Sequence, residues 1–429
     1  MMKMNSRIGL LIAAMVLSLS TFAASVSTDR TWYLAGEAMQ VNISVDDALI
    51  AYAELCDKYS LAASTVVSLN DGKGTGIIEL PSDLHSGYYV LSVYTRHQAQ
   101  VAHQLVAVVN ALHKSEDDDI EWANITHPDS LSYPSFGRGN GFSTADLVDV
   151  KPVDVRETEG HIIKARVKNV DGEQILRGSL IRPSLSIVGK QIHYFEGKMV
   201  NDSLAVFYTY GLHGKQPLVL SAASYTGASL PIEMISPFAT LLPKRLPHLV
   251  FHYKRSEVEE RSLDMQRHQI AIAPAKRELQ LGDYADDTAE DGVPLDYDDS
   301  LFGTKPDPAY NLDEYRQFLT IREVLLEYVN CVRKTKINGV SQLVVRRPED
   351  AYVSVWPAMV LIDGMPVIDI ERLLDYDARR IHYINVYGGQ YTFGNGVYNG
   401  ILSFVTRSGK LTNYPIEPNM QYLVYEFPQ

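Results

Sequence analysis

The chain has 429 residues, which is enough for about two to four domains. Hydrophobic residues make up 46% of it and charged residues 21%, an ordinary globular composition that can build buried cores. The formal net charge is −13, which argues against nucleic acid as a partner and predicts repulsion from anionic lipid head groups.

The first 23 residues read as a secretory signal peptide. Lys3 and Arg7 form the charged start, Ile8–Leu19 is an apolar run too short to span a bilayer comfortably, and Thr21–Ala23 is a plausible cleavage site. A membrane anchor is the alternative, but no second apolar segment of spanning length follows, so we expect no membrane span in the mature chain. Without this leader 37 basic and 52 acidic residues remain, a formal charge of −15. We therefore expect an exported protein that is periplasmic, outer-membrane-associated or exposed at the cell surface.

Residues 24–110 predict a first β-sandwich. Apolar residues occupy every second position from Met39 to Val45, a strand follows at Tyr88–Thr95, and turn residues lie at Asn70–Gly74. Several short strands at this spacing favour a sandwich. Within them, Ala51–Leu61 is expected to be an insertion or a short helix.

Two stretches of this region, DRTWYLAGEAMQVNISV (29–45) and LPSDLHSGYYVLSVYTR (80–96), resemble the MG2-type domain of the α2-macroglobulin family. That family uses the domain as a structural module, so the resemblance implies a scaffold role. The macroglobulin thioester region has no counterpart in this sequence, and no covalent trapping chemistry is implied.

The middle of the chain predicts a second sandwich between two poorly patterned regions. Residues 111–150 read as a linker, and residues 151–240 read as a β-rich unit that glycines punctuate. Residues 241–314 read as an acidic linker region, in which Ser256–Gln280 has the composition of a surface helix. Asp283–Asp299 holds eight acidic residues and no basic residue, which favours a mobile loop.

Residues 315–410 carry the clearest pattern. Asn311–Asn330 has helical spacing of its apolar residues, and the pieces LIDGMPV (361–367), IHYINVYGG (381–389) and GVYNGILSFVTRSG (396–409) follow it. Together they resemble the plug domain of TonB-dependent outer-membrane receptors, over roughly the last quarter of the chain. The resemblance implies a small α+β domain whose sheet is a structural gate. The predicted fold class is therefore mostly β: two tandem β-sandwich domains followed by a small α+β plug-like domain.

The residues of this plug-like motif have structural roles in our interpretation. Asp363 can hydrogen-bond the turn backbone, and Gly364 can adopt a positive φ. The other motif positions are interpreted as parts of the strand-turn, bends or close backbone approaches: Pro366, Gly388, Gly389, Gly394, Gly396 and Gly400. Since aromatic side chains anchor interfaces, Tyr391, Phe393 and Tyr398 are the candidate contacts for a partner.

Twenty residues follow Gly409. A membrane-spanning strand needs about 9–11 residues and a closed barrel at least about eight strands, so residues 411–429 are expected to form a tail. A barrel partner would therefore come from another chain. No TonB box is recognisable at Ala24–Arg30, so energised gating is not expected of this chain alone.

No strong catalytic motif is present: there is no Gly-x-Ser-x-Gly elbow, no His-Glu-x-x-His and no phosphate loop, and no cofactor is expected. His248 and His252 flank an apolar triplet that favours a strand, which would place the imidazoles roughly 13 Å apart, too far for one metal. The acidic loop has some spacing of a calcium loop (Asp287, Asp291, Gly292 and Asp298), but Ala289 stands at a ligand position, so a solvated loop is favoured. Cys56 and Cys331 are read as separate thiols, although an oxidising compartment leaves a disulfide open.

These observations support two functional hypotheses. The first is a non-enzymatic accessory protein at the outer membrane, whose plug-like domain docks with or gates a β-barrel protein or complex supplied by another chain. The second is a secreted or surface module that binds peptide or glycan in adhesion.

Overall fold

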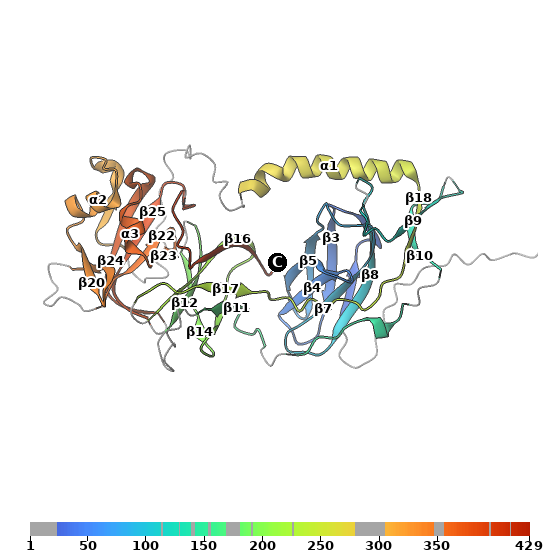
Figure 1. Cartoon of the computed structure of the whole chain (residues 1–429), viewed down its shortest axis with the longest axis horizontal. Helices are drawn as coiled ribbons and strands as arrows, with labels where there is room; N and C mark the ends of the chain where they lie inside the picture. Colours follow the sequence, from blue (N-terminus) through green and yellow to red (C-terminus); the bar gives the residue numbers. More distant parts are fainter. Residues whose placement is uncertain are drawn as a thin grey trace, which may run out of the picture. The chain divides into compact units, whose positions relative to one another are not determined.

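The computed structural model describes residues 24–112, 115–127, 129–138, 142–152, 156–168, 181–189, 192–224, 227–278, 305–346, 356–393, 396–411 and 413–429 (Figure 1). The chain divides into two compact units. Unit 1 is Met1–Thr158, Phe238–Ala273 and Pro428–Gln429, and unit 2 is Glu159–Pro237 and Pro274–Phe427. Both are built mainly from β-strands, which confirms the predicted fold class. The predicted leader 1–23 and the acidic run 283–299 lie outside the described residues.

Unit 1 contains the expected sandwich. One sheet has the order β1-β3-β6, formed by Ser25–Thr28, Ala38–Ser44 and Lys73–Glu79. The other has the order β2-β8-β7-β4-β5, formed by Trp32–Leu34, Val101–Val109, Gly87–Tyr94, Ile50–Cys56 and Leu61–Ser68. In β3 every second side chain, Met39, Val41 and Ile43, enters the core, as the period-two pattern predicts.

Strand β4 departs from the expectation of an insertion or short helix at 51–61. All seven of its residues are buried, because a later segment of unit 1 covers its outer face. The buried carboxylate of Glu54 accepts hydrogen bonds from the backbone N–H groups of Ala239 (2.6 Å), Thr240 (3.1 Å) and Leu241 (2.9 Å), and from the Tyr94 hydroxyl. A strand covered on both faces loses the alternation by which sequence reasoning finds strands.

Parts of both predicted linkers form structure in unit 1. A third sheet has the order β10-β18-β9, formed by Tyr133–Phe136, Leu249–Tyr253 and Ile120–Asn124. A one-turn 3₁₀ helix, η1, spans Thr144–Asp146. The helix α1, Arg255–Glu278, follows β18 and matches the predicted surface helix 256–280 closely. Arg261 of this helix lies 3.8 Å above the Trp32 ring and donates to Glu37 at 2.9 Å, which fixes the helix on the sandwich.

Unit 2 contains the second sandwich. One sheet has the order β14-β15-β11-β17, formed by Lys198–Met199, Leu204–Thr209, His161–Val167 and Ile232–Ile235. The other has the order β13-β12-β16-β26, formed by His193–Glu196, Arg182–Ile187, Gly214–Ala223 and Gln421–Phe427. Residues 411–429, expected to be a tail, therefore contribute β26. It pairs antiparallel with β16 over seven residues, and this partner lies too far away in sequence for local patterns to reveal it.

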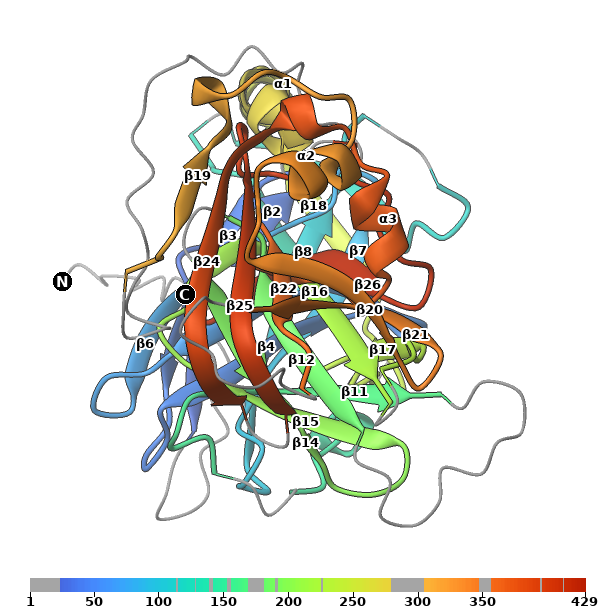
Figure 2. The same ribbon diagram turned by 90° about the vertical axis from the view of Figure 1, so that its left-hand side faces the viewer.

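The rest of unit 2 is an α+β module with a five-stranded mixed sheet (Figure 2). It contains the residues for which the sequence predicts a plug-like domain, and it is named the plug-like module after that prediction alone. Its order is β19-β24-β25-β22-β23, formed by Ala309–Asn311, Ile381–Phe393, Gly396–Thr406, Met359–Ile362 and Met365–Pro366. The module also has the helices α2 (Ile321–Glu327) and α3 (Ile370–Leu374), the 3₁₀ turns η2 (Leu312–Glu314) and η3 (Ala378–Arg380), and the hairpin β20–β21 (Val332–Ile337 and Val340–Val345). Because β26 follows the module, the sandwich strands enclose it in sequence.

We predict that Phe427→Ala destabilises unit 2 by about 3–5 kcal/mol, since this fully buried ring belongs to the sandwich core and its loss leaves a cavity. Chemical denaturation of the full chain measures the change. Val200→Ala, at a position 61% exposed in the same unit, is the control and should change stability by less than about 0.5 kcal/mol. Equal midpoints for the two variants would contradict the assignment of β26 to the core.

Candidate functional site

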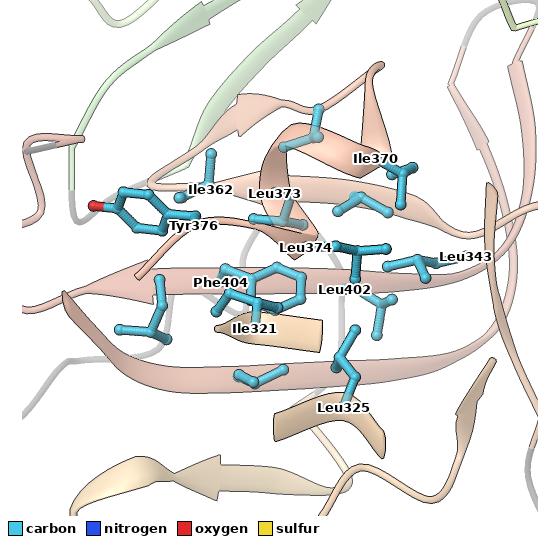
Figure 3. Packing of buried hydrophobic residues seen from close by; sticks show 14 of the residues in the cluster. Ile321, Leu325, Leu343, Ile362, Ile370, Leu373, Leu374, Tyr376, Leu402 and Phe404 are labelled. Atoms are coloured by element: carbon cyan, nitrogen blue, oxygen red, sulfur yellow. The ribbon is translucent and has the colours of Figure 1, made fainter. Parts of the chain in front are cut away.

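The plug-like module is organised around a hydrophobic core between its sheet and its two helices (Figure 3). Helix α2 begins with a capping box, in which Thr320 and Glu323 satisfy each other's backbone N–H groups. The helix then directs Ile321 and Leu325 inward. These side chains meet residues of α3 and of the central strands: Ile370, Leu373, Leu374, Ile362, Leu402 and Phe404. The core gives the module one fixed geometry.

Asp363 is the buried polar centre of the module and is 2% exposed. Its Oδ1 accepts from the Thr406 N–H at 2.8 Å, and its Oδ2 accepts from the Thr406 hydroxyl at 2.6 Å and the Leu411 N–H at 2.9 Å. Burial raises the pKa of this carboxyl group, while the three hydrogen bonds act in the opposite direction. The side chain joins the β22–β23 turn to the end of β25 and to the residues that follow it.

The Asp363–Gly364 turn also connects the module with the unit 2 sandwich. Both residues have positive φ, +44° and +81°, as a two-residue hairpin turn of the Asp-Gly type requires. The Asp363 carbonyl accepts from the Gly189 N–H at 3.2 Å. A Cβ on Gly364 would lie 3.0 Å from the Ile187 carbonyl oxygen, so a side chain there would press on the sandwich backbone.

The other motif positions lie at bends and close approaches in the same sheet. Pro366 lies in the edge strand β23, where its register partner is Leu361 of β22. Gly388 and Gly389 fall where the register of β24 against β25 shifts, and Gly396 begins β25. A Cβ on Gly400 would lie 2.9 Å from Val345, so β21 approaches β25 closely there. Gly394 lies outside the described residues.

The three candidate contact aromatics, Tyr391, Phe393 and Tyr398, lie near the far end of the β24–β25 hairpin and are half-buried. Phe393 meets Tyr194 of the unit 2 sandwich edge-to-face at 5.7 Å, and Arg182 lies 5.5 Å above the Tyr398 ring. Burial raises the pKa of Tyr398. The structure thus brings all three together, and they pack in part against the chain's own sandwich.

Sequence reasoning missed Glu417, a second buried carboxylate of the module. Its Oε1 accepts from the backbone N–H groups of Ile368 (2.9 Å) and Asp369 (2.8 Å), just before α3. Burial raises its pKa as well. A glutamate in an irregular stretch gives no pattern by which a sequence could reveal it, because its partners are backbone groups nearly fifty residues away.

The exposed side of the module carries two leucines and an ion network. Leu319, just before α2, is 64% exposed, and Leu326 within α2 is 78% exposed. Arg322 of the same helix pairs with Glu371 at 3.0 Å and Asp375 at 2.7 Å. Hydrogen bonds to its carboxylate lower the pKa of Glu371 to about 2, and the bond from Lys334 has the largest effect. Leu326 is therefore exposed on a helix that polar contacts hold in place, and Leu319 is exposed just before it.

The histidines considered as metal ligands do not converge. His248 Nδ1 lies 2.5 Å from Asp119 Oδ1, and His252 Nε2 lies 3.0 Å from the Ser135 hydroxyl. Among the described residues no group of three or more His, Cys, Asp or Glu side chains is arranged to hold a metal ion. The calcium-loop positions Asp287, Asp291, Gly292 and Asp298 fall outside them. Cys56 and Cys331 are both free thiols, in units 1 and 2 respectively.

No protein-family model matches the chain, and no curated protein matches it. Among solved structures, the trypsin-activated α2-macroglobulin of Escherichia coli is similar at 14% identity, over 51% of this chain and 16% of that one, with a TM-score of 0.19. A Salmonella α2-macroglobulin mutant is similar at 10% identity, over 56% of this chain and 16% of that one, with a TM-score of 0.18. The Escherichia coli adhesin FdeC is similar at 12% identity, over 54% of this chain and 65% of that one, with a TM-score of 0.17.

This chain thus spans about a sixth of the length of the macroglobulins that it resembles. Within the described residues, no helix combines the length and apolar character needed to cross a membrane.

We predict that Gly364→Ala destabilises unit 2 more than Gly339→Ala. Both glycines occupy hairpin turns at nearly the same φ, +81° and +82°, so both substitutions incur the cost of a side chain in the left-handed region, about 1–2 kcal/mol. Only Gly364 also abuts the Ile187 carbonyl, whereas nothing lies within 4 Å of the Gly339 position. Thermal denaturation compares the two variants. Equal melting temperatures would show that the Asp363–Gly364 turn does not pack on the sandwich.

Proposed function

We propose that the protein is an exported, non-enzymatic accessory protein of the outer membrane. Its plug-like module docks with or gates a β-barrel that another chain supplies, and no cofactor takes part. The observation that carries this proposal is the plug-like sheet. Strand β22 runs parallel to β25, the helices α2 and α3 pack into one core with it, and the buried carboxylate of Asp363 locks its turn. The leader-like residues 1–23 support export.

The docking surface follows from what the module leaves exposed. Tyr391, Phe393 and Tyr398, the contacts expected from sequence, are half-buried within unit 2, so they supply only part of their surface to a partner. Leu319 and Leu326 are largely exposed, and Arg322 of the same region carries ion pairs with Glu371 and Asp375. Exposed apolar residues with a polar rim are typical of protein interaction sites. We therefore assign these leucines to the contact with the barrel protein.

The test is capture from detergent-solubilised outer membranes of a Gram-negative cell, with tagged full-length protein as bait. We expect the wild type to retain a β-barrel protein and the double variant Leu319→Glu/Leu326→Glu to lose it at least about tenfold, since a charge buried in an interface has no partner. Leu263→Glu, on helix α1 of unit 1 and 53% exposed, is the matched control and should retain capture. Capture of no barrel protein, or equal capture by all three baits, would contradict the proposal.

A second candidate function has an observation in its favour. Unit 1 exposes three aromatic side chains from the edge strands of its β10-β18-β9 sheet: Trp122 (41%), Tyr133 (44%) and Phe136 (59%). Exposed aromatic groups mark binding surfaces, and their rings pack well on apolar peptide side chains and on the C–H faces of sugars. Trp122 and Phe136 share one face of this sheet, since their register partners are Phe251 and Leu249, whereas Tyr133 stacks on His252 at the other face. The pair Trp122 and Phe136 fits a secreted or surface module that binds peptide or glycan.

Binding of the full-length protein to peptide and glycan arrays tests this alternative. If unit 1 is a binding module, Trp122→Ala/Phe136→Ala should weaken binding about tenfold or more, because each lost aromatic contact is worth about 1 kcal/mol. Tyr59→Ala, at a position 73% exposed elsewhere in unit 1, should leave it unchanged. Absence of any bound peptide or glycan would dismiss the second function.

A further inference from the structure

A groove in unit 1 lies between helix α1 and the backbone that leaves strand β8. Its volume is about 360 Å³, which falls within the range of small-ligand sites in proteins. All the residues that line it belong to unit 1. None of them belongs to the surfaces that the previous subsection assigns to a barrel protein, a peptide or a glycan.

One face of α1 holds the helical wall of the groove on the sandwich. Met265 lies over Gly36, where an added Cβ would be 2.8 Å from the Met265 Sδ. One turn later, Gln269 Nε2 donates to the Gly36 carbonyl at 2.7 Å. The adjacent face of the helix, again at a spacing of four residues, contributes Gln266 and Ile270 to the groove.

The opposite wall is held by Asn110, the residue that follows β8. Its side-chain Nδ2 donates to the Leu84 carbonyl at 2.8 Å and to the Ser82 carbonyl at 3.3 Å. Its Oδ1 accepts from the Leu112 N–H at 3.2 Å. Both walls are thus fixed within unit 1, and a preformed site loses less conformational entropy when a ligand binds.

The lining of the groove indicates a neutral, mainly apolar ligand. Its floor consists of the buried side chains of Leu34, Ala35 and Val109. The two lips carry Leu112, which is 55% exposed, and Ile270, which is 74% exposed. None of the described residues that line the groove is charged, although charged residues make up 21% of the chain. A charged ligand would lose its hydration here without gaining an ionic partner.

The polar groups of the groove favour a peptide over a glycan. Gln266 and Gln269 both line it, and each primary amide offers donors and an acceptor that match those of a peptide group. Aromatic rings, which pack well on the C–H faces of sugars, do not occur in the described part of the lining. Met265 supplies a flexible side chain that adapts to an aliphatic one.

We propose that this groove binds an extended, uncharged peptide segment through one or two aliphatic side chains of the size of leucine. These side chains lie on the floor between Leu112 and Ile270, and the two glutamine amides meet the peptide backbone. The site goes beyond both functions proposed above. Because it shares no residue with either contact surface, each can fail without the other.

The test uses the neutral dipeptide acetyl-Leu-Leu-amide as the probe and the full-length protein with ¹³C-labelled methionine methyl groups. The variant Met265→Leu identifies the Met265 signal in the NMR spectrum. We expect this signal to shift saturably as the probe is added, with a Kd on the order of 1 mM for so small a ligand. The charged dipeptide acetyl-Asp-Asp-amide should leave it unchanged. A signal that never saturates with the leucine probe, or an equal response to the aspartate probe, would overturn the proposal.

A pair of variants places the binding in the groove itself. The double variant Leu112→Glu/Ile270→Glu puts two charges at the lips and should weaken binding of the probe at least about tenfold. Leu263→Glu changes a 53% exposed position of the same helix that is not among the lining residues, and it should bind like the wild type. Equal affinity of all three proteins would overturn the assignment to the groove. Saturation by the neutral disaccharide diacetylchitobiose, without any by the leucine probe, would overturn the peptide as the ligand.

Discussion

The buried carboxylate of Asp363 is the interaction on which the plug-like module depends. It accepts three hydrogen bonds, two from Thr406 and one from Leu411. Through them the two-residue turn is joined to the end of β25 and to the residues that follow β25. Asp363 and Gly364 also meet the backbone of the unit 2 sandwich. Glu417 holds the same connection further on, at the start of α3. Two carboxylates thus position the segment that returns the chain to β26.

Sequence reasoning succeeded where contacts are local. The period-two pattern of Met39–Val45 predicts β3, the Asp363–Gly364 pair predicts a turn after a strand, and the helix predicted at 256–280 is α1. It failed where distant segments decide the structure. Strand β4 is buried on both faces, and strands β9 and β18 pair in parallel across more than a hundred residues. A residue pattern carries no signal for such pairings, so the sequence predicts an insertion or short helix for β4 and a linker for β9. The triplet 249–251 of β18 does predict a strand, but its two neighbours in the sheet cannot be predicted.

In the candidate site, too, the local features could be predicted and the distant contacts could not. Asp363, Gly364 and the glycines of β24 and β25 could be predicted because turns favour particular residue types at particular positions. The surroundings of Tyr391, Phe393 and Tyr398 were not found, because Tyr194 and Arg182 come from another strand system of the same unit. Glu54 and Glu417 were missed for a related reason. Each accepts hydrogen bonds from backbone N–H groups, which nearly every residue type has. The residue types of the partners therefore give no sign of these contacts in the sequence.

The enclosure of the plug-like module between sandwich strands has a practical consequence for dissecting this protein. A recombinant fragment that starts at residue 305 and ends at 427 would carry β26 with no β16 to receive it, and one that spans 159–237 would present a bare sheet edge. Both fragments are candidates for aggregation. A soluble miniature of unit 2 requires the two stretches to be fused across the excised part, or a circular permutation that brings Gln421–Phe427 next to Gly214–Ala223.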